Sequence, residues 1–230
     1  MFAANAAAST AEIAFLADLS DREINRLVDD NVLPRALVAR NRSRRFAPLA
    51  AAFAEFYFQT SECLTRSARM HVIEALTERV LAHPQTEALL MLSAEMKRVR
   101  LDWTVAYSGV TVELTPYVKG AMGRVERVRR ALRSIVEDQK TLGGMPCFKG
   151  TRLPIANVLG MVDEGTRFEE LCFAYPFLTV DLIEDAQIYA KTRPRLGRPR
   201  RIKQMFPGAR LVRSKVVQLH QEPHKAASSD

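Results

Sequence analysis

The chain has 230 residues, of which 47% are hydrophobic, with 10 glycines and 11 prolines, and this composition excludes a collagen-like or wholly disordered protein. Its length predicts more than one domain. The net charge is +8, but residues 191–230 hold eleven Lys or Arg against two acidic residues, a local +9, so the other 190 residues carry −1.

The cysteines and the start of the chain indicate the compartment. Cys63, Cys147 and Cys172 are widely spaced and form no C-x-x-C pair, so they indicate neither a disulfide framework nor a zinc site, and a reducing environment fits best. Residues 2–19 have no basic beginning and contain Glu12 and Asp18, so we expect no signal peptide. No run approaches the roughly 18 apolar residues of a membrane span. We therefore expect a cytoplasmic protein that does not bind membranes.

Residues 9–60 predict a compact helical unit with a hairpin. Ile13, Leu16 and Ala17 have the spacing of one helix face over residues 10–18. Ser20 followed by Glu23 is a capping box, so a second helix is expected to begin near residue 21. The apolar residues expected to face inward from it are Ile24, Leu27 and Val28.

Two short helices joined by a tight turn predict a helix-turn-helix, whose second helix lies in the major groove of DNA. Arg22, Asn25 and Arg26 form the polar stripe of that helix. We expect these three to read bases, because arginine pairs with guanine and asparagine with adenine.

Residues 34–46 predict a β-hairpin wing with a polar turn near Asn41. Five arginines in eleven residues are expected to reach phosphates or a minor groove, and the alternative is a solvated loop. The wing arginines are Arg35 and the four predicted DNA contacts Arg40, Arg42, Arg44 and Arg45.

The middle of the chain is predicted to be mostly helical. Helices are expected over residues 48–60, 65–82 and 85–99. Alternating apolar residues on either side of Ser108 and Gly109 predict a β-hairpin over residues 101–114. A basic helix over residues 117–136 then leads into the next domain.

Residues 134–190 carry an ordered series of short motifs. It begins with Gly143-Gly144-Met145-Pro146, Phe148-Lys149 and Gly150-Thr151-Arg152-Leu153-Pro154, and continues with Gly165, Glu169-Glu170-Leu171, Tyr175-Pro176, Leu178-Thr179 and Ala190. This series closely resembles the small helical domain known as domain of unknown function 433. The family-motif residues that we single out are Gly143, Gly144, Pro146, Gly150, Thr151 and Arg152.

Local signals predict three short helices here, a second homeodomain-like unit. Pro154 suits the first turn of a helix and Gly165 its end. Thr166 with Glu169 predicts a capping box, and Thr179 starts the last helix.

The glycine-rich loop over residues 143–152 has two interpretations. It could cradle a phosphate, but five residues separate Gly144 from Gly150 and Lys149 precedes the second glycine, unlike a P-loop. We favour the interpretation that the glycines shape a tight connection and that Arg152 caps or bridges helices.

Proteins that join a winged helix-turn-helix to this domain resemble VapB-type antitoxins, whose partners are PIN-like ribonucleases. The resemblance implies an antitoxin that binds its own operator DNA, acts as a homodimer or as a hetero-oligomer with the toxin, and inhibits the nuclease. The alternative is a standalone helix-turn-helix transcriptional regulator.

The basic tail favours a binding role. Its prolines, glycines and charge predict disorder in isolation, while its apolar residues predict folding on a partner. A PIN-like active site holds metal with carboxylates, so we expect Arg210, Arg213 or Lys215 to neutralise it. Alternatively, Gly197-Arg198-Pro199-Arg200 resembles the core of an AT-hook that binds DNA. The predicted toxin contacts are Arg198, Arg200, Arg201, Phe206, Arg210, Arg213 and Lys215.

The sequence does not favour an enzyme. It contains no H-E-x-x-H motif or nucleophile elbow, and we expect no catalytic residue, metal or cofactor. Three acidic pairs could bind metal for nuclease chemistry, but their positions on amphipathic helices favour solvated surface. These pairs are Asp163 with Glu164, Glu169 with Glu170, and Glu184 with Asp185.

The predicted fold class is mainly α, with two small helix-turn-helix-type domains joined by helices and a short β-hairpin, and a disordered basic tail. The predicted boundaries are residues 1–115 for the winged helix-turn-helix domain, 116–192 for the homeodomain-like domain, and 193–230 for the tail.

Overall fold

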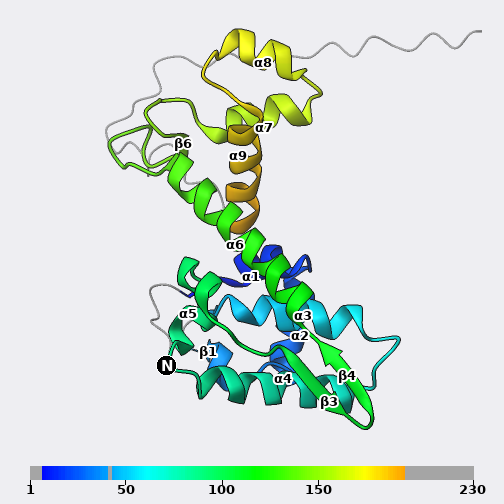
Figure 1. Cartoon of the computed structure of the whole chain (residues 1–230). Coiled ribbons are helices and arrows are strands. Elements are labelled where there is room, and N and C mark those ends of the chain that lie inside the picture. Colours follow the sequence, from blue (N-terminus) through cyan, green and yellow to red (C-terminus); the bar gives the residue numbers. More distant parts are fainter. Residues whose placement is uncertain (1–6, 41–42, 195–230) are drawn as a thin grey trace, which may run out of the picture. The chain divides into compact units, whose positions relative to one another are not determined.

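The computed structural model describes residues 7–40 and 43–194, and it is mainly helical, as the sequence predicts (Figure 1). The described part contains nine α-helices and three two-stranded antiparallel sheets. None of its helices has the length and apolar content needed to cross a membrane.

The first two helices are α1 (Thr10–Ala17) and α2 (Asp21–Asp29). The predicted capping box is confirmed: Ser20 Oγ accepts from the Glu23 amide at 3.3 Å, and Glu23 Oε2 accepts from the Ser20 amide at 2.7 Å. Asp18 adopts a left-handed conformation that ends α1 and makes the turn. The inward-facing residues are also as predicted, since Ile13, Leu16, Ala17, Ile24, Leu27 and Val28 are all buried.

The β-hairpin that was predicted to form a wing is present as β1 (Val38–Arg40) and β2 (Arg44–Phe46), which follow the short 3-10 helix η2 (Arg35–Leu37). Val38 pairs with Phe46, and Phe46 is fully buried. The Ala8 amide donates a hydrogen bond to the Phe46 carbonyl, and the Ala8 carbonyl accepts one from the Phe46 amide. The segment before α1 therefore extends this small sheet. The wing is therefore anchored in the same core as the two helices.

Helices α3 (Leu49–Gln59) and α4 (Arg66–Leu81) agree with the predicted spans. The single helix predicted over residues 85–99 is wrong. Instead, α5 (Thr86–Leu90) ends early, Leu92 takes a positive φ of 44°, and the 3-10 helix η3 (Ala94–Arg98) follows. This break turns Leu92 and Met96 into the core, so burial of apolar side chains overrides the helical pattern.

Strands β3 (Thr104–Tyr107) and β4 (Val110–Glu113) form the predicted second hairpin, in which Tyr107 pairs with Val110. Ser108 and Gly109 have φ values of 48° and 82°. Two consecutive left-handed residues give the turn type whose twist matches paired antiparallel strands.

The second half is built on α6 (Thr115–Ser134) and α9 (Val180–Thr192), which pack against each other. Between them lie α7 (Ile155–Asp163), α8 (Phe168–Ala174), and the strands β5 (Ile135–Val136) and β6 (Cys147–Phe148). Gly165 has a φ of 87° after α7, and Thr179 caps α9 by accepting from the Leu182 amide at 3.2 Å, both as predicted.

The capping box predicted at Thr166 is wrong. Helix α8 is preceded by Arg167, whose side chain makes no capping bond. The Thr166 amide instead donates to the Met161 carbonyl, so this residue still belongs to the end of α7. Thr166 therefore completes the left-handed turn around Gly165 before α8 begins.

Two buried clusters share the central helices. The larger contains α1 to α5, both hairpins and the inner face of α6, and it also includes Ile188 from α9. The smaller contains residues of α7 to α9 with Ile135 and Phe148. The predicted boundary at residue 115 coincides with the start of α6, but α6 and α9 contribute to both clusters. Of the predicted tail, residues 193–230, Arg193 and Pro194 are described, and the remainder lies outside the described residues.

Replacing Ser20 with alanine should lower the free energy of unfolding by about 1 kcal/mol, because the first turn of α2 loses its capping hydroxyl. Urea denaturation followed by circular dichroism measures this change. The control is Ser67→Ala, an exposed serine inside α4, which should leave stability nearly unchanged. Equal stability of the two variants would show that the capping box does not stabilise this unit.

Candidate nucleic-acid interface

The outward face of α2 carries the first predicted base readers. Arg22 and Arg26 are both exposed, and Arg26 pairs loosely with Asp30 at 3.4 Å across one helical turn. An exposed pair of this kind contributes little to stability and is easily exchanged for another partner. Arg22 lies in the first turn of α2, the part of a recognition helix that meets base edges.

Arg44 fastens the wing to α2. Its Nη1 donates to Asn25 Oδ1 at 2.7 Å, and its Nη2 pairs with Asp29 Oδ1 at 2.6 Å. Asn25 and Arg44 were both predicted to touch DNA, and the structure brings them together as partners within the protein. The Asn25 side-chain amide keeps its two N–H groups as donors. Arg44 therefore fixes the wing beside α2 and neutralises the carboxylate of Asp29.

The remaining wing arginines differ in their placement. Arg45 is exposed on β2. It lies within electrostatic reach of Glu12 on α1, where burial raises the pKa of the Glu12 carboxyl and the charges of Arg193 and Arg45 partly oppose that rise. Arg40 ends β1, and Arg42 lies outside the described residues.

The surface of α2 is not uniformly basic. Its exposed arginines alternate with acidic side chains, several of which already have partners in the protein, such as Glu23 with Ser20 and Asp29 with Arg44. The acidic residues are Asp21, Glu23, Asp29 and Asp30. Nonspecific attraction to phosphates at this helix is therefore modest, and affinity would depend on specific contacts.

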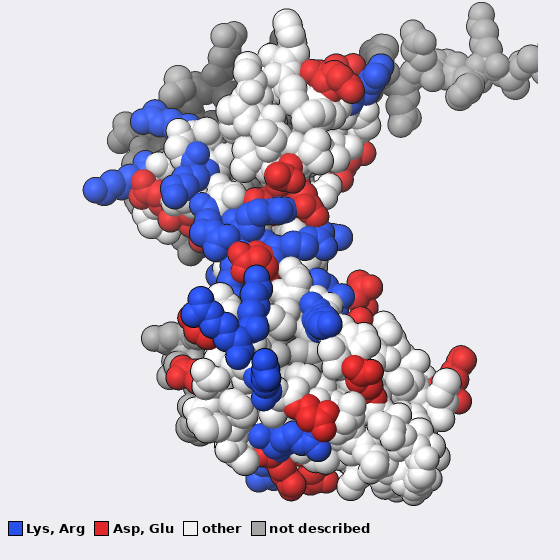
Figure 2. All heavy atoms as spheres, viewed as in Figure 1, with Lys and Arg blue, Asp and Glu red and all other residues white. Residues whose placement is uncertain are grey.

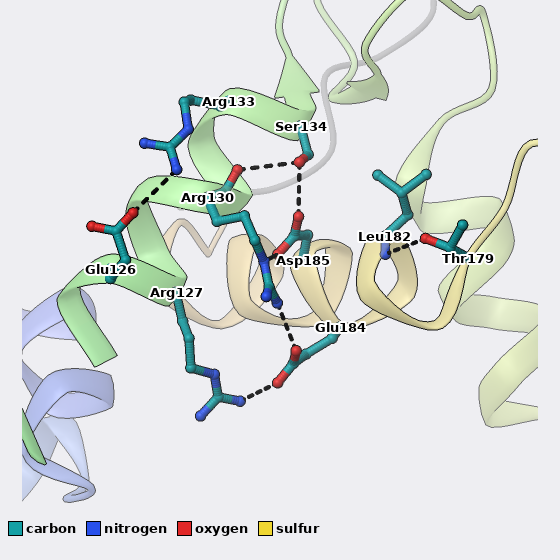
Figure 3. Close-up of polar contacts among 9 residues, drawn as sticks. All are labelled: Glu126, Arg127, Arg130, Arg133, Ser134, Thr179, Leu182, Glu184 and Asp185. Atoms are coloured by element: carbon teal, nitrogen blue, oxygen red, sulfur yellow. Dashed lines mark hydrogen bonds and ion pairs between the residues drawn. The ribbon is translucent and has the colours of Figure 1, made fainter. Parts of the chain in front are cut away.

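A network of charges joins α6 to α9 (Figure 3). Arg130 Nε donates to Asp185 Oδ1 at 2.7 Å, and its Nη2 donates to Glu184 Oε2 at 2.6 Å. The other oxygen of Glu184 accepts from Arg127, and Ser134 Oγ donates to Asp185 Oδ2 at 2.7 Å. The Asp185 side chain is only 2% exposed. The sequence interpretation of this acidic pair as solvated surface is therefore wrong.

The network shifts the pKa values of two of its members, Glu184 and Arg130. Hydrogen bonds from Arg130, and then from Arg127, hold the pKa of Glu184 below its ordinary value. Asp185 first and Glu184 second raise the pKa of Arg130 above its ordinary value. Glu184 and Arg130 are therefore held in their charged forms.

The glycine-rich loop forms a tight connection. Gly143, Gly144 and Gly150 have φ values of 66°, 81° and 77°, which favour glycine. Thr151 fastens the turn, since its hydroxyl donates to the Phe148 carbonyl and accepts from the Leu153 amide. The Pro146 carbonyl accepts from the amide of Ile155, the first residue of α7.

Arg152 does not bridge or cap helices as expected. Its side chain is exposed and makes no hydrogen bond or ion pair with another residue of the described chain. The loop already closes through its own backbone and Thr151, so no long side chain is required to hold it.

The other acidic pairs are exposed. Asp163 and Glu164 end α7, and Glu169 and Glu170 begin α8, where Glu169 pairs with Arg167 at 3.5 Å. Over residues 7–40 and 43–194, no three His, Cys, Asp or Glu side chains are grouped as metal ligands would be. The predicted toxin contacts Arg198, Arg200, Arg201, Phe206, Arg210, Arg213 and Lys215 lie outside the described residues.

Comparison with known proteins assigns the family. Residues 135–190 match the family described as "Protein of unknown function (DUF433)". The chain is 32% identical over 206 residues to the uncharacterized protein y4eO of Sinorhizobium fredii (strain NBRC 101917 / NGR234), covering 90% of each. The chain belongs to the family of y4eO and carries a DUF433 domain. A solved structure, Rv2018 from Mycobacterium tuberculosis, is similar at 17% identity with a TM-score of 0.37, covering 78% of this chain and 95% of that one.

The charge network between α6 and α9 lies only partly within the residues that match DUF433. Glu184 and Asp185 lie within the matched residues, whereas Arg127 and Arg130 precede them on α6. The helix that leads into the DUF433 domain is thus tied to the last helix of that domain.

Glu184→Gln should lower the free energy of unfolding by about 1 kcal/mol at neutral pH, because two arginines lose a charged partner. The folded-state pKa of Glu184 is lowered, so its contribution is complete above the ordinary value of 4.5 and is lost as pH falls through the folded-state value. Denaturation at a series of pH values should show the two proteins converging as the pH falls below 4.5 and through the lowered pKa of Glu184.

The control for this experiment is Glu169→Gln, which removes a carboxylate from an exposed ion pair in the same domain. Its stability should follow the wild-type curve at every pH. A constant difference between Glu184→Gln and the wild type down to acidic pH would mean that the charge of Glu184 is not what stabilises the α6 and α9 pair.

Proposed function

We propose that this protein is a DNA-binding antitoxin that represses its own operon and inhibits a PIN-like ribonuclease toxin. The DNA-binding part depends on one observation: Arg44 holds the wing against α2 through Asn25 and Asp29, next to the outward-facing Arg22 and Arg26. This fixed helix and wing supports the winged helix-turn-helix interpretation of residues 9–60.

The dimensions of α2 are suitable for a major groove. An α-helix with its side chains is about 10–12 Å across, and the major groove of B-DNA is about 12 Å wide, so a helix such as α2 can enter it. The capped first turn places Arg22 at the leading end of the helix, with Arg26 one turn further along. A bidentate arginine contact to guanine discriminates against other bases by about 1 to 3 kcal/mol.

The partner-binding part rests on the resemblance to VapB-type antitoxins and on the charge of the tail. Residues 191–230 carry a local charge of +9, which suits the carboxylate-lined active site of a metal-dependent nuclease. In this proposal the protein has no catalytic role and works in the cytoplasm, as a homodimer or as a hetero-oligomer with the toxin. A homodimer would match a two-fold operator.

Arg22→Ala and Arg26→Ala should each weaken binding to the operator upstream of the gene by about 1 to 3 kcal/mol and relax base preference at one position of the site. Fluorescence anisotropy with the operator and single-base variants measures both effects. The matched control is Arg167→Ala, which removes an exposed arginine from a similar loose pair outside the helix-turn-helix. Unchanged affinity and base preference in both α2 variants would refute DNA reading by this helix.

Affinity purification of the full chain from its native cells at high salt should recover a small acidic nuclease in stoichiometric amount, because burial of apolar tail residues resists salt better than charge pairing alone. Mass spectrometry of the eluate identifies the partner. Recovery of the chain alone, still able to shift its upstream DNA, would refute the antitoxin role and favour a standalone regulator with an AT-hook-like tail.

A further inference from the structure

A groove of about 500 Å³ lies between α6 and the segment around η3. Figure 2 shows Lys and Arg side chains gathering over α6 in this view. Six basic side chains line the groove against one acidic side chain, Glu126. The basic residues are Lys97, Lys119, Arg127, Arg129, Arg130 and Arg133.

Two arginines of the groove, Arg127 and Arg130, are held by partners in the protein and keep further donors. Arg130 uses Nε and Nη2 toward α9, which leaves Nη1 of its guanidinium, and Arg127 is bound through Nη2 alone. Arg133 reaches Glu126 at 3.2 Å and is 64% exposed. Side chains that are already oriented lose little conformational entropy when an anion binds.

Arg129 builds one wall of the groove. Its Nη1 donates to the Leu92 carbonyl at 3.3 Å, and its Nη2 donates to the Met91 carbonyl at 3.2 Å. These bonds tie α6 to the turn after α5 and hold Lys97 of η3 across from the basic face of α6. The cations on the two sides therefore face a common space.

Gly123 lies in the floor of the groove in the middle of α6. Glycine in a helix interior destabilises it relative to alanine, so a reason for this residue is needed. A Cβ at Gly123 would meet no atom within 4 Å, so packing inside the protein does not require glycine. Its absence of a side chain leaves room for the close approach of a ligand backbone.

We propose that this groove binds the phosphate backbone of double-stranded DNA, without reading sequence, as a surface additional to α2 and the wing. Lys119 and Arg133 are fourteen residues apart on one helix, a rise of about 21 Å, which spans several phosphates at about 3.4 Å per strand step. No aromatic side chain lines the groove, so it offers no platform on which unpaired bases could stack, and its contacts are suited to phosphates. The proposal does not require α2 to contact DNA.

The test is the salt dependence of binding to duplex DNA of unrelated sequence, measured by fluorescence anisotropy on the full chain. The variant combines Lys97→Gln, Lys119→Gln and Arg133→Gln, three exposed side chains of the groove. Loss of three phosphate contacts should reduce the magnitude of the negative slope of log K against log salt by about 2 to 3. The matched control combines Lys140→Gln, Lys149→Gln and Lys191→Gln, three exposed lysines outside the groove, and it should keep the wild-type slope.

A second variant, Gly123→Glu, places a carboxylate in the open floor of the groove and should weaken binding to the same duplex by tenfold or more, with an unchanged circular dichroism spectrum. An unchanged slope in the triple variant, or an equal loss in its control, would overturn the proposal. The proposal would also be overturned if the triple variant bound DNA as the wild type does but no longer bound an acidic protein partner. That result would assign the groove to the protein partner.

Discussion

The fold depends on the buried carboxylate of Asp185. A charge that is only 2% exposed is costly unless it is paired, and here Arg130 and Ser134 from α6 satisfy it. Because both partners lie on one helix, Asp185 fixes the rotation of α9 about its axis as well as its position along α6. Glu184 extends this polar contact between α6 and α9 toward solvent through its ion pair with Arg127.

The polar contact between α6 and α9 connects the two buried clusters. Helix α9 also contributes Ile188, about one turn after Asp185, to the larger core, and α9 contacts α1 of the proposed helix-turn-helix. The orientation of α1, and of α2 through the capped turn, therefore depends on a helix whose sequence belongs to the DUF433 match. The proposed DNA-reading unit and the DUF433 domain share a structural support rather than a linker.

Local signals made most of the secondary structure predictable. The capping box at Ser20, the Ser108-Gly109 turn and the left-handed stop at Gly165 each depend on residues within a few positions of one another. The break after α5 and the pairing of Arg44 with Asn25 depend on contacts between distant residues, which periodicity does not reveal. The charge network between α6 and α9 was not predicted for the same reason. The sequence shows the arginines of α6 and the adjacent acidic residues of α9, but it does not show that these residues contact one another.

The covering of α3 by α6 limits how this architecture can be divided and recombined. Helix α3 is almost entirely apolar, with Leu49, Phe53 and Phe56 fully buried, and α6 is among the elements packed on it. A fragment cut at the start of α6 would present that surface to water and to other chains, which favours aggregation. We therefore do not expect the N-terminal unit to fold without α6. A gene fusion that exchanges one half of the protein would have to include both α6 and α9.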